Sequence, residues 1–433
     1  MTKIALHWQI LIAILLAGLA GYLVNVTGAG DPFAPQLFGI SFLTAFNYLG
    51  ELFLNALKMI IVPLIMSSII VGMAGIGSSG NLGALGGRTL FFYAVTTTVA
   101  ILIGLILINA VGPGYEDGQP VGEMLAFEKS AEDVAAKVQG KGASDVADIF
   151  LRMVPPNIVK AAVEGEMLGI IFFALLFGYF MTRVGHEFAE PMYKFWDGVF
   201  NVMMKMTGWI MKFAPIGVFG LVAAVVAESG FRATRPLAIF AVTVLAALAI
   251  HTFALMPLLM RFVGRINPWK MYPAMAPALL TAFSTASSSA TLPVTMDCVE
   301  KNVGVSNKVS SFVLPLGATV NMNGTALYEC AAAMFLAQAY GLELTFATQF
   351  SIVLIALLTS VGVAGVPSAS LVAIAIILGA IGLPAEAIGV LMVFDRLLDM
   401  ARTSVNIFGD AVCAVIVARL QGEETHFAID AKS

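Results

Sequence analysis

The chain reads Ala282-Phe-Ser-Thr-Ala-Ser-Ser-Ser-Ala-Thr-Leu-Pro293 in one apolar region and Ser360-Val-Gly-Val-Ala-Gly-Val-Pro-Ser-Ala-Ser370 in another. Each stretch interrupts an apolar segment at its middle, and each is followed by a helix that carries polar groups. The spacing is nearly equal: 33 residues separate Ser288 from Asn321, and 34 separate Gly365 from Asp399. Close packing of membrane helices explains single small residues. Two equally spaced polar units instead indicate a duplicated unit, a re-entrant hairpin followed by a helix, with a binding site between the copies.

The composition excludes a water-soluble globular protein. Of the 433 residues, 59% are hydrophobic and only 12% are charged, with a mean hydropathy of +0.92; soluble domains carry about a quarter charged residues. The net charge of -4 gives no basic excess, so nucleic acid is excluded as a partner. The three cysteines form no C-x-x-C spacing and are interpreted as small buried hydrophobic residues.

The apolar segments predict an all-α polytopic membrane protein with about eight transmembrane helices and two re-entrant helical hairpins. A span needs about 20 apolar residues. Spans are expected over 8–26, 43–76, 89–111, 168–182, 195–227 and 237–263, and almost continuously over 309–420. The first segment is interpreted as an uncleaved helix because it is longer than the apolar region of a signal peptide.

The distribution of basic residues predicts the orientation. Residues 115–148 hold eight acidic residues and three lysines and are expected to form an external loop. Short basic loops are then cytoplasmic, and they contain Arg183, Lys194, Arg261, Arg265 and Lys270. The protein is therefore expected in the cell membrane as a multi-pass protein with both termini in the cytoplasm.

One face of the last predicted helix is polar. Its residues are Asp395, Asp399, Arg402, Asn406 and Asp410, separated by 4, 3, 4 and 4 positions. At 100° per residue they fall within an arc of about 80°. Apolar runs flank them on both sides, so this face is expected to line a protein-enclosed, wet cavity. A buried Asp–Arg pair that only locks helices together remains the alternative.

These residue types suit an acidic amino acid. The guanidinium of Arg402 matches a carboxylate, and Asp399 can accept from an ammonium group. A second carboxylate could bind Thr403 and Asn406 and the backbone N–H groups at the tip formed by Ser287, Ser288 and Ser289. A plain dicarboxylate would be repelled by Asp399.

Other polar residues at membrane depth suit cations. Asp410 has no basic partner nearby in sequence, and carbonyls of an unwound segment at 321–325 would suit Na⁺. Tyr93, Thr96 and Thr97 place hydroxyl oxygens on one helix face, although packing and back-bonding also explain them. Glu329 follows Tyr328 within an apolar segment that is predicted to be helical. It is a candidate proton carrier, with a structural acid as the alternative.

Several long motifs carry a resemblance to a known family. They are Leu57-Lys-Met-Ile-Ile-Val-Pro-Leu64, Ser287-Ser-Ser289, Leu314-Pro-Leu-Gly-Ala-Thr319, Asn321-Met-Asn-Gly-Thr-Ala-Leu-Tyr328, Ala364-Gly-Val-Pro367, Asp399-Met-Ala-Arg-Thr-Ser-Val-Asn406 and Gly409-Asp410. Over essentially its whole length the chain resembles the dicarboxylate/amino acid:cation symporters. These include archaeal aspartate transporters, bacterial glutamate symporters and the excitatory amino acid transporters of animals. The resemblance implies inverted repeats.

The resemblance also implies site residues. Substrate positions would be Ser288, Met322, Thr325, Val366, Asp399, Arg402, Thr403 and Asn406, with Arg402 on the side-chain carboxylate and Asp399 on the amino group. A first sodium site would comprise Gly317, Asn321, Asn406 and Asp410. A second would use backbone at Thr319, Met322, Ser360, Val361 and Val363. A third would comprise Tyr93, Thr96, Thr97, Asn321 and Asn323.

A homotrimer with an elevator mechanism is implied as well. The fixed scaffold would comprise residues 1–88 and the helices of 114–235. The moving transport part would comprise 89–113 and 236–420, with both hairpins, and 421–433 would form a cytoplasmic tail.

The chain departs from the family pattern at three places. Asn323 stands where the family usually has Asp. Ala286 and Met400 stand where many members have an arginine, and the nearest arginine is Arg396, one turn earlier. Glu329 matches the animal transporters, whereas archaeal members have Gln.

The sequence therefore predicts a secondary active symporter of L-aspartate or L-glutamate, with Na⁺ and a possible contribution of H⁺ as coupling ions. A C4-dicarboxylate:cation symporter is the closest alternative, and an intramembrane enzyme or an anion channel belongs to another class. No His-Glu-x-x-His, Gly-x-Ser-x-Gly or P-loop pattern occurs, so the chain is not expected to be an enzyme.

Overall fold

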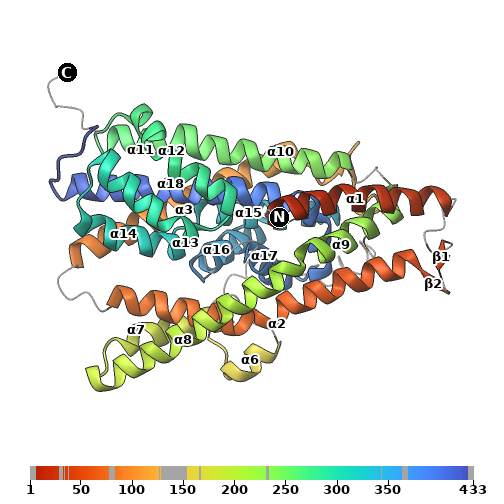
Figure 1. The fold of residues 1–433 in the computed structure, drawn as a ribbon, viewed down its shortest axis with the longest axis horizontal. Coiled ribbons are helices and arrows are strands. Elements are labelled where there is room, and N and C mark those ends of the chain that lie inside the picture. Colours follow the sequence, from red (N-terminus) through yellow and green to blue (C-terminus); the bar gives the residue numbers. More distant parts are fainter. Residues whose placement is uncertain are drawn as a thin grey trace, which may run out of the picture.

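The computed structural model describes residues 6–28, 33, 35–37, 39–77, 83–125, 127, 154–164, 167–230, 234–342, 344–362 and 369–427. This part of the chain is mostly helical, and its long helices extend along the long axis of the molecule (Figure 1). Two short antiparallel ribbons, β1 (Gln36–Leu37) with β2 (Ile40–Ser41) and β3 (Tyr115–Glu116) with β4 (Gln119–Pro120), lie between helices. The prediction of an all-α membrane protein is confirmed at this level.

Three helical stretches within the described residues are long and apolar enough to cross a membrane by length and composition: Leu85–Val111, Thr234–Phe262 and Ala387–Leu420. A fourth results if the bent pair His186–Ile210 and Ala214–Glu228 counts as one span. Shorter apolar helices add Ile12–Thr27, Val62–Ala74, Phe172–Met181 and Thr348–Ser360. The total of about eight spans stays a prediction.

The span expected over 195–227 is broken in the structure. α8 (His186–Ile210) and α9 (Ala214–Ser229) meet at a 3₁₀ turn over Met211–Phe213 and are bent by 56°. Pro215 lies in the first turn of α9. Because proline has no N–H group, it cannot continue the hydrogen-bond pattern of α8, and its ring favours the start of a new helix.

One set of helices packs mainly on itself. It consists of α1 (Leu6–Thr27), α2 (Phe42–Gly77), α6 (Ile158–Glu164), α7 (Met167–Met181), α8 and α9. α1 and α2 both pack against α9, and α2 also packs against α7 and α8. Glycine permits close approach here, because a Cβ at Gly220 would lie 2.6 Å from the backbone oxygen of Phe46.

The remaining helices surround α18 (Met392–Leu420), which is buried from Leu398 to Ala418 almost without interruption. They are α3 (Gly83–Val111), α10 (Thr234–Ile250), α11 (Met256–Phe262), α12 (Pro268–Thr285), α13 (Ser288–Asp297), α14 (Asn307–Val320), α15 (Asn323–Ala339), α16 (Phe346–Gly362) and α17 (Ala369–Ile381). Two π-helical segments, η3 (His251–Leu255) and η4 (Cys298–Val303), and the 3₁₀ helix η5 (Ala385–Leu391) complete this set. α3, α10, α12, α14 and α15 all pack against α18 (Figure 1).

A helix break occurs in the first of the two interrupted stretches of sequence and another follows it at Asn321. α12 ends at Ala286, whose φ of 50° and ψ of 40° are left-handed, and Ser287 caps α13 by accepting a hydrogen bond from Ala290 N–H. α14 and α15 are separated only at Asn321 and Met322. The connection between α16 and α17, residues 363–368, lies outside the described residues, as does most of the expected external loop.

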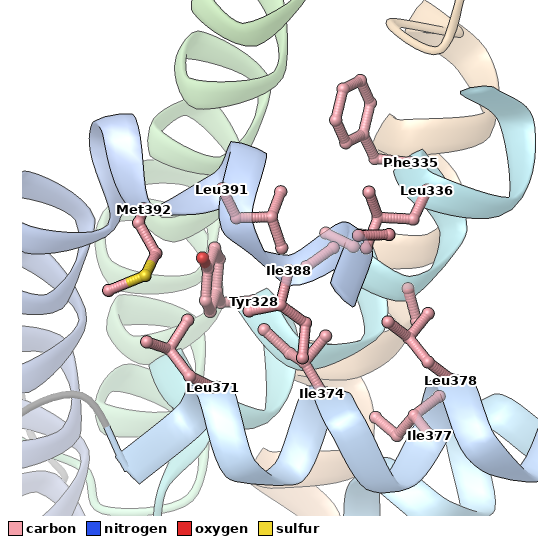
Figure 2. Packing of buried hydrophobic residues seen from close by; sticks show 14 of the residues in the cluster. Tyr328, Phe335, Leu336, Leu371, Ile374, Ile377, Leu378, Ile388, Leu391 and Met392 are labelled. Carbon is pink, nitrogen blue, oxygen red and sulfur yellow. The ribbon is translucent and has the colours of Figure 1, made fainter. Parts of the chain in front are cut away.

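A hydrophobic cluster fixes α15 against α17 and η5. Figure 2 shows Tyr328 beside Leu371, Leu391 and Met392 within this cluster. Tyr328 is fully buried, although it carries a hydroxyl group. This cluster positions the ring of Tyr328 on the side of α15 that faces the start of α18.

The segment that follows α18 is tied to the base of α13 and α14. The carboxylate of Glu423 accepts from the N–H and hydroxyl of Ser306, and His426 N–H donates to Val303 O at 2.9 Å. Asn267 N–H donates to Phe427 O at 2.9 Å. Residues 421–427 therefore join the ends of three helices.

We expect Gly220→Ala to destabilise the protein. The added Cβ would meet backbone oxygen of Phe46 at 2.6 Å and backbone nitrogen of Gly50 at 2.9 Å, neither of which can rotate away. Overpacking of this kind costs about 1–3 kcal/mol. The measurement is the melting temperature in detergent. Gly208→Ala on α8, where nothing lies within 4 Å of the new Cβ, is the control and should melt at or above wild type; equal melting temperatures of both variants would contradict the packing assignment.

Candidate functional site

A fully buried guanidinium forms the centre of the candidate site. Arg402 Nη2 donates to Asp395 Oδ1 at 3.1 Å and to Asp399 Oδ1 at 3.0 Å. Its guanidinium carbon lies 3.7 Å from the centroid of the Tyr328 ring. A buried cation needs such partners, because removal from water costs several kcal/mol.

Two donor groups of Arg402 remain available. Its Nε and Nη1 are buried and have no hydrogen-bond partner among the described residues. Buried donors without partners are rare in folded proteins, and a bound ligand is one explanation for them. The fork of Arg402 can therefore accept an additional carboxylate while Asp395 and Asp399 stay in place.

Arg396 lies close to the same carboxylates. Its Nη1 is 3.7 Å from Asp399 Oδ2, and its side chain is 6% exposed. Asp395, Arg396, Asp399 and Arg402 thus form a cluster of two acids and two bases on one helix. Because every ion pair of the cluster lies within α18, the pairs do not lock two helices together, as the alternative interpretation required.

Asn406 connects α18 to the break between α14 and α15. Its Oδ1 accepts from Gly324 N–H at 2.8 Å, and its Nδ2 donates to Thr325 Oγ1 at 3.0 Å and to the sulfur of Met322 at 3.3 Å. The two helices can approach closely because Gly324 has no side chain. A Cβ at this position would lie only 2.8 Å from the backbone oxygen of Arg402. Thr403 is buried next to these groups and donates to Asp399 O at 2.8 Å. Asp399, Arg402, Thr403, Asn406, Met322 and Thr325 are therefore brought together.

Oxygen atoms from three helices surround Asp410. Asp410 Oδ1 accepts from Asn321 Nδ2 at 2.8 Å, and Thr97 donates to Asn323 Oδ1 at 2.7 Å. Thr96 lies 3.5 Å from Asn321 Oδ1, and a Cβ at Gly317 would touch both Asp410 Oδ1 and the Tyr93 hydroxyl. All of these residues are buried.

This oxygen cluster fits a monovalent cation. Asp410 is buried, and no basic side chain pairs with it among the described residues. The described part of the chain also has no group of three or more His, Cys, Asp or Glu side chains that could hold a metal ion. One carboxylate with neutral amide and hydroxyl oxygens suits Na⁺ better than a divalent ion, which takes more carboxylates.

A cavity of about 310 Å³ adjoins this cluster. It is lined by Tyr93 and Thr97 of α3, Thr319 at the end of α14 and Ser360 near the end of α16, with apolar residues of α2 on the other side. The structure therefore brings Thr319 and Ser360 of the expected second cation site to one space. Val361 lies in the last turn of α16, and Val363 and Val366 lie outside the described residues.

Glu329 connects α15 to α16. Its Oε2 accepts from Thr359 Oγ1 at 3.0 Å, while Oε1 has no partner among the described residues. Both side chains are buried.

The tip between α12 and α13 holds the three serines predicted for the substrate site. Ser288 is buried and Ser289 is exposed, while Ser287 caps α13. α12 and α13 both pack against α18, and Ser404 donates to Leu279 O of α12 at 3.1 Å.

One contributor was not expected from sequence: Tyr328 covers the guanidinium of Arg402 from another helix, α15. Asp395 belongs to the polar face predicted for the last helix, and the structure pairs it with Arg402 seven positions later. Nothing in the sequence indicates the contact with Tyr328, because it depends on how α15 crosses α18.

Comparison with known proteins identifies relatives over the whole chain. The model of the sodium:dicarboxylate symporter family matches residues 6–420. The proton/sodium-glutamate symport protein of Geobacillus stearothermophilus is 35% identical over 423 residues, which are 98% of this chain and 96% of the relative. The proton/glutamate-aspartate symporter of Escherichia coli (strain K12) is 34% identical over 96% of this chain and 93% of its own. Human excitatory amino acid transporter 3 is 35% identical over 88% of this chain and 80% of its own.

Proposed function

The chain belongs to the sodium:dicarboxylate symporter family, and we propose that it moves L-aspartate or L-glutamate into the cell together with Na⁺ and H⁺. The family consists of symporters and not of enzymes. Relatives along the full chain are named proton/sodium-glutamate and proton/glutamate-aspartate symporters. The observation that carries the proposal is the pair of unpartnered donors of Arg402 next to Asp399.

This pair distinguishes an acidic amino acid from a C4-dicarboxylate. Arg402 offers Nε and Nη1 to a side-chain carboxylate, and Asp399 offers an acceptor to an ammonium group. A dicarboxylate places a second negative charge where the ammonium would lie. In a water-poor site, that like-charge contact opposes binding.

Charge balance supports coupling to a cation. The α18 cluster of Asp395, Arg396, Asp399 and Arg402 has no net formal charge, so an acidic amino acid adds one negative charge. Asp410 adds another, and buried charges without partners are costly in a membrane. Cations bound with the substrate neutralise both, which makes Na⁺ a co-substrate at the oxygen cluster around Asp410. Na⁺ also fits the backbone groups near Thr319, Met322 and Ser360.

Two helix sets support an elevator mechanism. The set of α1, α2 and α6–α9 packs mainly on itself, and the set around α18 holds the whole candidate site. In the proposal the first set is the fixed scaffold, within 1–88 and 114–235. The second set, within 89–113 and 236–420, contains both re-entrant hairpins and moves together with the substrate. The chain assembles as a homotrimer in the cell membrane, with both termini in the cytoplasm.

Glu329 is proposed as the proton carrier. Its buried Oε1 is unpartnered in the described part of the chain, so a proton there places no charge in the apolar core. Asn323 leaves the Asp410 cluster with one carboxylate, and a proton on Glu329 is then a second coupled cation.

The test of the proposal is uptake of labelled aspartate into proteoliposomes, with Na⁺, H⁺ and K⁺ gradients imposed separately. Uptake driven by Na⁺ and competed by glutamate but not by succinate supports the proposal. Competition by succinate as strong as that by glutamate indicates the C4-dicarboxylate alternative, and flux without a gradient requirement indicates a channel.

Replacing Arg402 by Ala is expected to weaken binding of acidic substrates far more than that of neutral ones. The side-chain carboxylate loses charge-assisted hydrogen bonds of about 1.5–3 kcal/mol each, whereas serine has no such carboxylate. Competition of aspartate and serine for the purified protein measures the difference, which we expect to reach roughly a hundredfold. Equal losses for both ligands would show that Arg402 does not select the side chain.

Replacing Asp410 by Asn is expected to raise the Na⁺ concentration required for aspartate binding by tenfold or more. The amide keeps the shape of the side chain but removes the one carboxylate that the described residues give to the oxygen cluster. Saturating Na⁺ should restore much of the affinity. Asp297→Asn, which removes an exposed carboxylate far from Arg402 in sequence, is the control and should leave the Na⁺ dependence unchanged. An unchanged Na⁺ dependence in Asp410→Asn would overturn the assignment.

Replacing Glu329 by Gln is expected to remove much of the pH dependence of uptake. The amide can still accept from Thr359, so the packing of α15 on α16 is kept while the titrating group is lost. Uptake from pH 5.5 to 8.5 at saturating Na⁺ is the measurement, and aspartate binding is the control that should survive. Identical pH profiles in wild type and variant would make Glu329 a packing residue.

A further inference from the structure

We propose that a groove at the shared end of α11 and α12 binds an anionic phospholipid. The groove has a volume of about 550 Å³ and lies between the end of the long α10–α11 stretch and the first turn of α12. We call it the basic groove. The side chains that carry the proposal are Phe253, Leu258, Arg261, Phe262, Asn267 and Trp269.

The walls of the basic groove are apolar and open. Phe253 is 58% exposed, Leu258 is 53% exposed and Phe262 is 73% exposed. These three side chains lie on one segment, η3 with α11, and the described part of the chain leaves more than half of each exposed. Their combined surface suits an acyl chain, because lipid-facing residues are apolar and a hollow holds a chain in place.

The rim of the groove is positively charged. Arg261 lines it, and Arg265 and Lys270 flank it in the turn and first helical turn that follow. All three side chains are exposed, and none forms an ion pair with a carboxylate in the part of the chain that the structure describes. Some exposed cations elsewhere do: Lys194 pairs with Glu190, Arg235 with Glu116 and Lys301 with Asp297.

Unpaired basic residues beside an apolar hollow match one chemistry. A phosphate diester with acyl chains supplies the negative charge and the apolar body together, and guanidinium groups bind phosphate well. Basic pockets at the cytoplasmic ends of membrane helices bind anionic head groups for this reason. Trp269 is 65% exposed at the same rim, where an indole ring is typical of the membrane–water interface.

Contacts behind the groove hold two of its lining residues, Phe253 and Asn267, in place. Tyr272 stacks on Phe253 at 5.4 Å between centroids and on Phe408 of α18 at 4.8 Å, and its hydroxyl donates to Thr252 O at 2.8 Å. Asn267 caps α12 by accepting from Trp269 N–H at 3.1 Å. Rigid walls reduce the entropy lost when a lipid binds.

The groove lies at the end of the molecule that also holds the C-terminal segment (Figure 1). In the proposed orientation this end faces the cytoplasm, where anionic lipids concentrate. The inference rests on the proposed membrane orientation but not on the identity of the transported substrate. A negative result for lipid binding would therefore leave the proposed transport function intact, and the reverse also holds.

The experiment measures retention of dioleoyl phosphatidylglycerol and dioleoyl phosphatidylcholine on the purified full chain by native mass spectrometry. The test variant is Arg261→Gln with Arg265→Gln and Lys270→Gln. The control, Arg183→Gln with Lys194→Gln and Lys301→Gln, removes the same charge from other exposed positions. A third variant, Leu258→Trp, fills the groove and keeps all three cations.

Wild type and the control are expected to prefer phosphatidylglycerol by at least tenfold. Each cation removed from the rim should reduce that preference roughly fivefold, so the test variant should show little preference. Leu258→Trp should lose retained lipid without loss of charge. The proposal is overturned if wild type retains both lipids equally, if the test variant keeps the wild-type preference, or if Leu258→Trp retains as much phosphatidylglycerol as wild type.

Discussion

A guanidinium that is completely buried at membrane depth must be neutralised by neighbours, and the arrangement around Arg402 follows from that requirement. Asp395 and Asp399 supply the countercharges from the preceding turns of the same helix, and Tyr328 supplies an aromatic face from α15. Only Nε and Nη1 are left over. The helix that holds this cluster must be enclosed on all sides, which explains why α18 is the centre around which the other helices of its set pack.

The close contact of α15 with α18 is the second requirement. Gly324 allows it, since any side chain there would meet the backbone of Arg402. The amide oxygen of Asn406 then accepts hydrogen bonds from the N–H groups of Gly324 and Thr325 at the start of α15. These N–H groups have no partner within the helix and would otherwise be buried without one. The helix break at Asn321 and Met322, the substrate cluster and the oxygen cluster around Asp410 are therefore parts of one connected structure.

Sequence reasoning reached the parts of this structure that depend on spacing along one helix. The polar face of Asp395 to Asp410, the break near Asn321 and the interruption at Ala286 and Ser287 follow from periodicity and residue type. The second interrupted segment, over 360–370, falls largely outside the described residues and stays a prediction. Sequence reasoning failed where a local feature overrode hydropathy, as at Pro215, which divides the span expected over 195–227. It could not give contacts between helices, such as Tyr328 with Arg402 or Thr359 with Glu329, because those depend on crossing geometry. Family membership was predicted from motifs and is confirmed by the match over residues 6–420.

The neutral cluster on α18 has an electrical consequence for the return of the empty carrier. Because the two arginines are matched by two acids on their own helix, releasing the substrate and its cations leaves Asp410 and the deprotonated Glu329 as charges that the cluster does not compensate. In the proposed elevator the unloaded unit then moves outward with about two negative charges. An inside-negative membrane potential favours that movement by up to about 2.3 kcal/mol per charge per 100 mV. The membrane potential would thus speed the return of the empty transport unit to the outward-facing state.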